Sequence, residues 1–102
     1  MSSLASWPLA PDSATGWCRL AASHWDLDGH FAVRHAVFVD EQRIFTGSDL
    51  DERDDDPATL HAVAVLDEVV VGAVRLYPTP GEGQWRGDRL ASLTTHRRRA
   101  AL

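Results

Sequence analysis

Residues 60–93 constrain the fold most, because their pattern predicts consecutive β-strands. The first run, Leu60–Leu66, is short and apolar, and the second, Val69–Tyr77, is rich in β-branched residues that pack well on a pleated surface. Only Asp67 and Glu68 separate the two runs, which is the spacing of a tight hairpin. We therefore expect these strands to be antiparallel neighbours at the centre of the core.

A third run, Trp85–Leu93, follows a loop rich in proline and glycine. Regular alternation along it would place Arg89, Ala91 and Leu93 on one face of the sheet and the intervening residues on the other. Together the three runs predict an antiparallel meander.

The segment before the meander predicts a strand and one long helix. The strand is Trp17–Ala22, and Asp26 or Asp28 is suited to cap a helix that ends near Gln42 or Ile44. Apolar residues recur at helical spacing through this segment: Leu27, Phe31, Val33, Val37 and Phe38. The order of elements predicts an α+β fold.

Composition limits the class of protein. A chain of 102 residues forms one domain at most, and we expect it to span residues 16–102 after a loose leader at 1–15. An apolar fraction of 44% and four tryptophans argue against disorder. Cys18 is the single cysteine, so we expect no internal disulfide and a reducing, cytoplasmic location. No apolar run approaches the ~20 residues that cross a bilayer, so we expect no membrane span.

Charge is distributed unevenly along the chain. The net charge of −5 combines an acidic body with a basic end, since residues 83–102 carry five arginines and one acid. Such an end could hold an anion or form a frayed basic tail. The acidic body would repel phosphate and no recognition motif is present, so we expect no nucleic-acid partner.

Six acids lie between Asp49 and Asp56. A calcium loop requires alternating oxygen ligands and a glycine at its sixth position, but Arg53 occupies a ligand position and Asp54 the glycine position. Two interpretations stay open. The acids form a solvated loop, or they form a wall of carboxylates beside a pocket for a cationic amine, where like charges raise one another's pKa.

No other residues have the spacing of a metal site or of a catalytic nucleophile. Cys18 has no neighbouring motif, and His30 and His35 are five residues apart, which misses a shared helical face. We therefore expect no metal. For Arg34 and His35, both inside the helix, we favour one side chain that points to solvent and one that caps or snorkels over an Arg34 that faces a pocket.

Five short motifs resemble, in order, the GNAT superfamily of acyl-CoA-dependent N-acyltransferases, over residues 17–99. They are VFVDEQ at 37–42, the acids at 49–56, HAVAV at 61–65, VVVGAVRLYP at 69–78 and WRGDRLASL at 85–93. The resemblance implies a GNAT-like fold and an N-acetyltransferase. Such an enzyme transfers an acetyl group from acetyl-CoA, its co-substrate, to a small-molecule amine.

The resemblance also implies residues that bind the cofactor. A backbone N–H at Ser92 or Leu93 would polarise the thioester carbonyl. Arg97, Arg98 and Arg99 would stand at the start of the loop that binds the pyrophosphate at a helix N-terminus.

Candidate residues for binding the amine acceptor and for removing its proton are acids and one arginine. Glu41, Asp54 and Asp88 are the candidates for the base that takes a proton from the amine. Arg34, Asp51 and Asp54 are the candidates for substrate binding.

The basic end departs from the family pattern. Ala100 and Leu102 stand where the loop has glycines, and Thr94-Thr95 stands where a Pro-Glu pair is usual. We therefore expect a domain that stops before the cofactor-binding helix, either truncated or a remnant without full activity.

Two alternatives stay open. The first is the acyl-homoserine-lactone synthases, which share the fold. The residues that resemble their pattern are Arg34, Phe38, Asp51, Asp54 and RLYPT at 75–79. However, the tryptophan that these synthases have after the helix is missing here, and GDRLASL fits the acetyltransferases better. The chain could instead be a non-catalytic assembly module, in which the open edge of the third strand pairs with a second copy as a homodimer.

Overall fold

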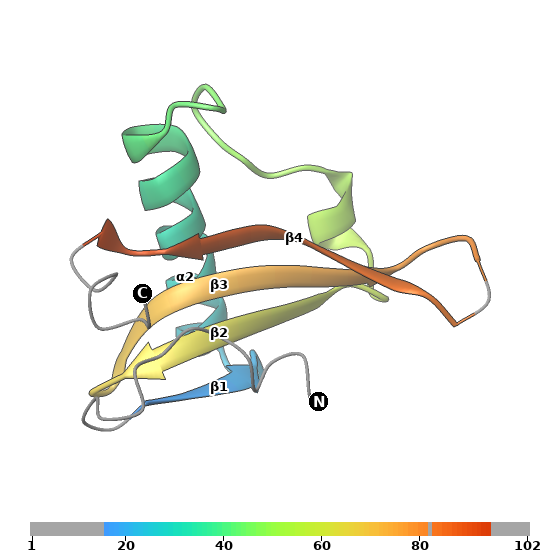
Figure 1. Cartoon of the computed structure of the whole chain (residues 1–102), viewed down its shortest axis with the longest axis horizontal. Coiled ribbons are helices and arrows are strands. Elements are labelled where there is room, and N and C mark those ends of the chain that lie inside the picture. The colour runs from blue at the N-terminus through green and yellow to red at the C-terminus, as the bar shows by residue number, and fades with distance from the viewer. Residues whose placement is uncertain (1–15, 82, 95–102) are drawn as a thin grey trace.

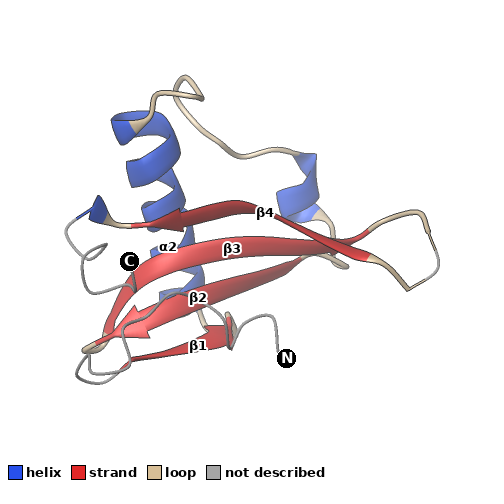
Figure 2. Ribbon diagram, in the orientation of Figure 1, coloured by secondary structure: helices blue, strands red, loops and turns tan. Residues whose placement is uncertain are grey.

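The computed structural model describes residues 16–81 and 83–94. Within them, antiparallel strands form one sheet in the order β1-β2-β3-β4. The strands are β1 Gly16–Leu20, β2 Leu60–Leu66, β3 Val69–Pro78 and β4 Trp85–Ser92. Figure 1 shows a helix, α2, behind this sheet, and Figure 2 shows the long loop that leads from the helix back to β2. The predicted α+β class and the antiparallel meander are confirmed.

Helix α2, His24–Arg34, continues without a break as a π-helical segment, His35–Glu41. Its N-cap is Ser23, whose hydroxyl accepts a hydrogen bond from the Asp26 N–H. The predicted cap at Asp26 or Asp28 is therefore wrong, because Ser23 satisfies the first helical N–H groups one turn earlier. The helical end at Glu41 lies where the sequence predicted it.

The core lies between α2 and the sheet, because α2 crosses β2, β3 and β4 on one face. Its buried members are Val33, Val37, Val63, Val65, Val70, Ala73 and Ala91. The closest approach is at Gly29, where an added Cβ would lie 2.6 Å from Cγ2 of Val70. Glycine at this position lets the helix pack directly on β3.

The hairpin turn between β2 and β3 has the predicted two-residue length. Asp67 and Glu68 have φ values of 51° and 67°. Positive φ at both central residues is the geometry of a type I′ turn, whose twist matches that of the flanking strands.

Strand β4 contains a bulge, so the predicted regular alternation is wrong at this point. Ala73 pairs with Ala91 and Arg75 pairs with Asp88, so two residues of β3 lie opposite three residues of β4. The extra residue is accommodated next to Arg89, whose φ is 55°. A bulge re-aims side chains. As a result the adjacent residues Asp88 and Arg89 reach the same group of charged side chains.

Several predictions fall outside the described residues. These are the leader at 1–15 and the arginines Arg97, Arg98 and Arg99. Within residues 16–81 and 83–94, no helix has the length and apolar character needed to cross a membrane.

Candidate functional site

A buried arginine holds the acidic loop against α2. The Nε of Arg34 donates to Asp49 Oδ2 at 2.7 Å, and its two terminal nitrogens donate to the Asp54 carboxylate at 2.7 and 3.0 Å. Arg34 is 0% exposed. Of this pair, His35 is exposed, as expected of one of the two side chains. The expectation that the other side chain caps or snorkels is wrong, because Arg34 is fully buried.

A second buried arginine, Arg75 from β3, ties the same loop to β4. It donates two hydrogen bonds of 2.8 Å to the Asp88 carboxylate and one of 2.6 Å to Asp51 Oδ1. Its Nη1 also lies 3.2 Å from Asp54 Oδ2. Asp54 therefore bridges Arg34 and Arg75, and such charge-assisted pairs fix geometry tightly.

The bulge of β4 supplies a third arginine. Arg89 donates to the backbone carbonyl of Asp49 at 3.0 and 3.2 Å and to the Asp51 carboxylate at 3.3 Å. Its guanidinium carbon lies 4.4 Å from the centre of the Phe45 ring. We call the following residues the charge cluster: Arg34, Asp49, Asp51, Asp54, Arg75, Asp88 and Arg89.

Opposite charges control protonation in the charge cluster. Hydrogen bonds from Arg75 hold the pKa of Asp51 below its usual range. Burial alone would raise the pKa of Asp54, but hydrogen bonds, first of all from Arg34, outweigh it and lower that pKa. The raised pKa values predicted for a carboxylate wall are therefore wrong, since both acids are ionised and bound to arginine at neutral pH.

Two histidines lie against the charge cluster. The Nδ1 of the buried His30 lies 3.0 Å from the carbonyl oxygen of Ala62, and its Nε2 lies 3.2 Å from Nη1 of Arg34. Because a guanidinium only donates, Nε2 accepts and Nδ1 donates, as in a neutral imidazole. Burial lowers the pKa of His30 to about 4. His61, at the start of β2, lies 3.2 Å from Asp54 Oδ1.

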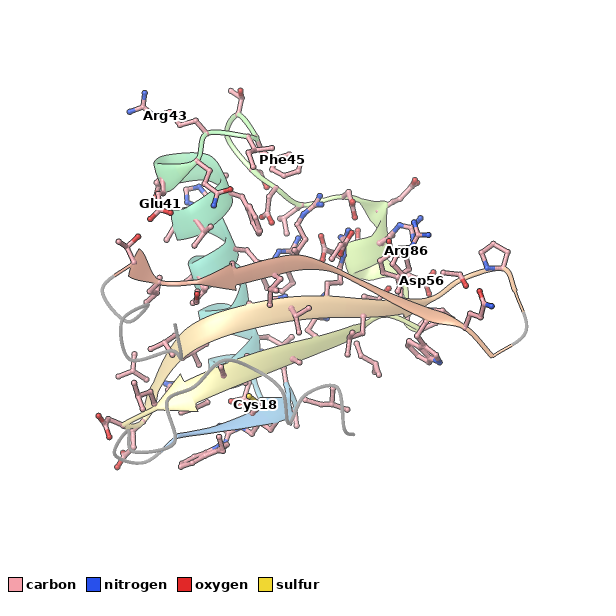
Figure 3. All side chains as sticks on the ribbon, in the orientation of Figure 1. Cys18, Glu41, Arg43, Phe45, Asp56 and Arg86 are labelled. Atoms are coloured by element: carbon pink, nitrogen blue, oxygen red, sulfur yellow. The ribbon has the colours of Figure 1, made fainter. Side chains whose placement is uncertain are left out.

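The end of β4 brings other predicted residues together. The Leu93 N–H donates to the Val71 carbonyl at 2.9 Å, so it belongs to the sheet. Because ladder bonds alternate along an antiparallel strand, the Ser92 N–H points away from β3. The Thr94 hydroxyl donates a hydrogen bond to the Glu41 carboxylate, which brings the helical end to the strand end. Figure 3 shows Glu41 on the side of the molecule where β4 ends and Asp56 on the opposite side.

A shallow apolar groove of about 500 Å³ lies between α2, the hairpin and the end of β4. We call it the apolar groove. Its lining residues are Trp25, Gly29, Ala32, Val33, Val69, Val70 and Leu93, with the carboxylates of Asp28 and Glu68 beside them.

The structure divides the predicted site residues into two groups. Asp54 and Asp88, two of the three candidate bases, are ion-paired in the charge cluster together with Arg34 and Asp51. Glu41, Ser92 and Leu93 lie at the strand end. Within the described ranges, no group of His, Cys, Asp or Glu is arranged to hold a metal ion.

The sequence interpretation missed the arginine partners of the acidic loop. Arg75 interrupts an apolar run on a strand buried on both faces, and a charge at such a position is usually paired. That signal was present in the sequence. The role of Arg89 depends on the bulge, which no local pattern revealed.

Comparison with known proteins relates the fold to one enzyme class. No family model and no curated protein matches the sequence. The structure matches the crystal structure of an acyl-CoA N-acyltransferase from Pseudomonas aeruginosa, with a TM-score of 0.63 and 26% sequence identity. The match covers 79% of this chain and 57% of that chain, so this chain spans less than two thirds of the solved protein.

Proposed function

Because the chain has an acyl-CoA N-acyltransferase fold of the GNAT type, we propose that it transfers an acyl group from acyl-CoA to a small-molecule amine. The donor that the sequence favours is acetyl-CoA. The observation that carries the proposal is the likeness to a solved acyl-CoA N-acyltransferase over 79% of this chain.

In this proposal the end of β4 holds the reacting thioester. The Ser92 N–H, which points away from β3, would polarise the thioester carbonyl as negative charge develops on its oxygen. Glu41 would take the proton from the amine, since its hydrogen bond with Thr94 brings it to this strand end. Leu93 would contribute its side chain alone, and Arg97, Arg98 and Arg99 would bind the cofactor phosphates.

The charge cluster has a supporting role in the proposal. Arg34 binds Asp54, and Arg75 binds both Asp51 and Asp54. They would act on the acceptor indirectly, by fixing the loop that borders the site.

Thermal unfolding in the presence of acetyl-CoA tests the proposal. A ligand that binds only the native state at 100 times its Kd adds about 2.7 kcal/mol of stability, so we expect a higher Tm. Ser92→Pro removes the backbone N–H, whereas Ser92→Ala keeps it. We expect the shift to persist in the alanine variant and to vanish in the proline variant. No shift in the unmodified chain at millimolar acetyl-CoA would favour a non-catalytic module instead.

A second candidate is an activity like that of the acyl-homoserine-lactone synthases. The charge cluster favours it, because Arg34, Asp51, Asp54 and Arg75, which carried that resemblance, converge in one network. Mass spectrometry of extracts from cells that express the chain would decide. Acyl-homoserine lactones above the level of an empty-vector culture would support this candidate, and their absence would remove it.

A further inference from the structure

We propose that the apolar groove binds the acyl acceptor, and that this acceptor is a hydrophobic primary amine in its cationic form. The inference rests on the proposed acyl transfer, and it names the class of amine. The apolar groove would bind the hydrocarbon part of the amine, and the two carboxylates beside the groove, Asp28 and Glu68, would attract its ammonium group.

The charge cluster is a poor site for a cationic acceptor. Its four carboxylates already bind three guanidinium groups. An incoming ammonium would have to displace an arginine such as Arg34, which is completely buried. Displacing it would leave a buried guanidinium without its carboxylate partners, which is strongly unfavourable. The amine therefore requires another site.

The apolar groove has the required chemistry. Its volume of about 500 Å³ lies within the usual range for small-molecule sites, roughly 300–1,000 Å³. Trp25 and Val69 remain 51% and 48% exposed although they are large and apolar, and exposed apolar residues that gather in one place mark binding surfaces.

The charge beside the groove is negative on both sides. Asp28 comes from α2 and Glu68 from the hairpin turn, and both are exposed. In the described part of the chain, neither makes an ion pair. An ammonium group could therefore approach either carboxylate while the apolar body of the amine covers Trp25 and Val69.

The position of the groove suits the reaction. Leu93 lines it, and the next residue, Thr94, donates a hydrogen bond to Glu41. The bound ammonium first loses a proton to solvent, and the neutral amine, no longer held by Asp28 or Glu68, moves along the groove to Leu93 at the strand end. Its nitrogen then attacks the thioester carbon, the C–N bond forms as the C–S bond breaks, and Glu41 takes the second proton. The departing CoA thiolate is protonated from solvent, so an amide and CoA thiol result.

Calorimetric titration of the full chain with n-octylamine, 1-octanol and ethylamine tests the inference. Each buried CH₂ contributes about 0.8 kcal/mol, so ethylamine should bind far more weakly than n-octylamine. The alcohol has the same chain without the charge, and we expect it to bind about tenfold more weakly because it lacks the ion pair. Equal affinity for octanol and octylamine would overturn the assignment of a cationic ligand.

Variants locate the binding in the groove. Ala32→Phe fills it from an exposed helical position, and Trp25→Ala removes one wall. We expect both to reduce n-octylamine affinity about tenfold, through occlusion or lost apolar contact. The pair Asp28→Asn and Glu68→Gln should reduce octylamine affinity to that of octanol. The matched control, Glu52→Gln and Asp55→Asn, removes the same charge from exposed positions of the acidic loop and should leave the affinity unchanged.

The result is separable from the proposed function. Unchanged octylamine affinity in Trp25→Ala and in folded Ala32→Phe would overturn the inference, whatever acetyl-CoA does to the Tm. An acetyl-CoA shift without octylamine binding would leave acyl transfer standing and reject the hydrophobic acceptor.

Discussion

Arg34 and Arg75 are the largest fully buried side chains in the part of the chain that the structure describes. A buried guanidinium without partners would cost several kcal/mol, so both require the carboxylates that surround them. In that same part, every buried side-chain nitrogen or oxygen has a hydrogen-bond partner. Because every member is satisfied, the network fixes the acidic loop in one position.

His30 gives the stability a pH dependence. Its pKa is about 4 in the folded chain and about 6.5 in an unfolded one. Between these values the unfolded chain binds more protons, so stability falls as pH decreases from 7 to 4, by about 3 kcal/mol at most. The lowered pKa values of Asp51 and Asp54 remove further stability as the pH falls below about 4.

We therefore expect His30→Gln to flatten the pH dependence between pH 7 and 5. A glutamine amide can still donate to the Ala62 carbonyl and accept from Arg34. The free energy of unfolding in urea, measured at pH 7, 6 and 5, gives the slope. His35→Gln changes an exposed histidine and should keep the original slope. An equally steep decline in both variants would show that His30 is not its source.

Single residues were predictable only where their neighbours in space were also neighbours in sequence. The burial of Arg34 was not predicted because its partners, Asp49 and Asp54, are 15 and 20 residues away. The neutral tautomer of His30 likewise depends on Ala62, 32 residues further on. Local patterns carry no information about such pairs.

Elements were more predictable than their details. The runs Leu60–Leu66 and Val69–Tyr77 are the strands β2 and β3 to within one residue, because apolar composition and a two-residue turn act locally. The start of α2 was misplaced because Ser23 competes with Asp26 as the cap. The bulge at Arg89 was missed because it serves contacts with the distant residues Asp49 and Asp51.

Gly29 tests the packing of α2 on β3. In an ordinary exposed helix, Gly→Ala stabilises by about 1 kcal/mol. Here the new Cβ would lie 2.6 Å from Val70, so we expect Gly29→Ala to destabilise by about 1–3 kcal/mol through overpacking. Chemical denaturation measures the change.

Val70→Gly supplies the control for this contact, because the β-carbon of residue 70, which an alanine would keep, itself lies 2.7 Å from the added Cβ. In the double variant the missing side chain makes room for the new methyl group, so the two changes should be less than additive. A stabilised Gly29→Ala variant, or strict additivity in the cycle, would contradict the close approach of helix and strand.

At the scale of the whole molecule, one helix and one charged loop organise a single sheet face. The apolar core occupies one part of that face and the charge cluster another, and α2 contributes to both through Val33 and Arg34. The groove and the strand end proposed for chemistry lie beside the apolar part. A substitution in the charge cluster that moves α2 would therefore also change the apolar groove and the end of β4.

The outer edge of β4 leads to a prediction about assembly. In the described residues, β4 pairs only with β3, and unpaired strand edges associate with other chains. Leu90, on this edge, is 63% exposed. We expect the chain to self-associate as its concentration rises, as measured by light scattering and sedimentation.

Leu90→Lys should shift the equilibrium to monomer, because a charged edge side chain opposes strand pairing. Leu50→Lys changes a loop leucine that is 58% exposed and should leave association unchanged. A monomer at all concentrations, or equal effects of the two lysines, would exclude pairing through β4.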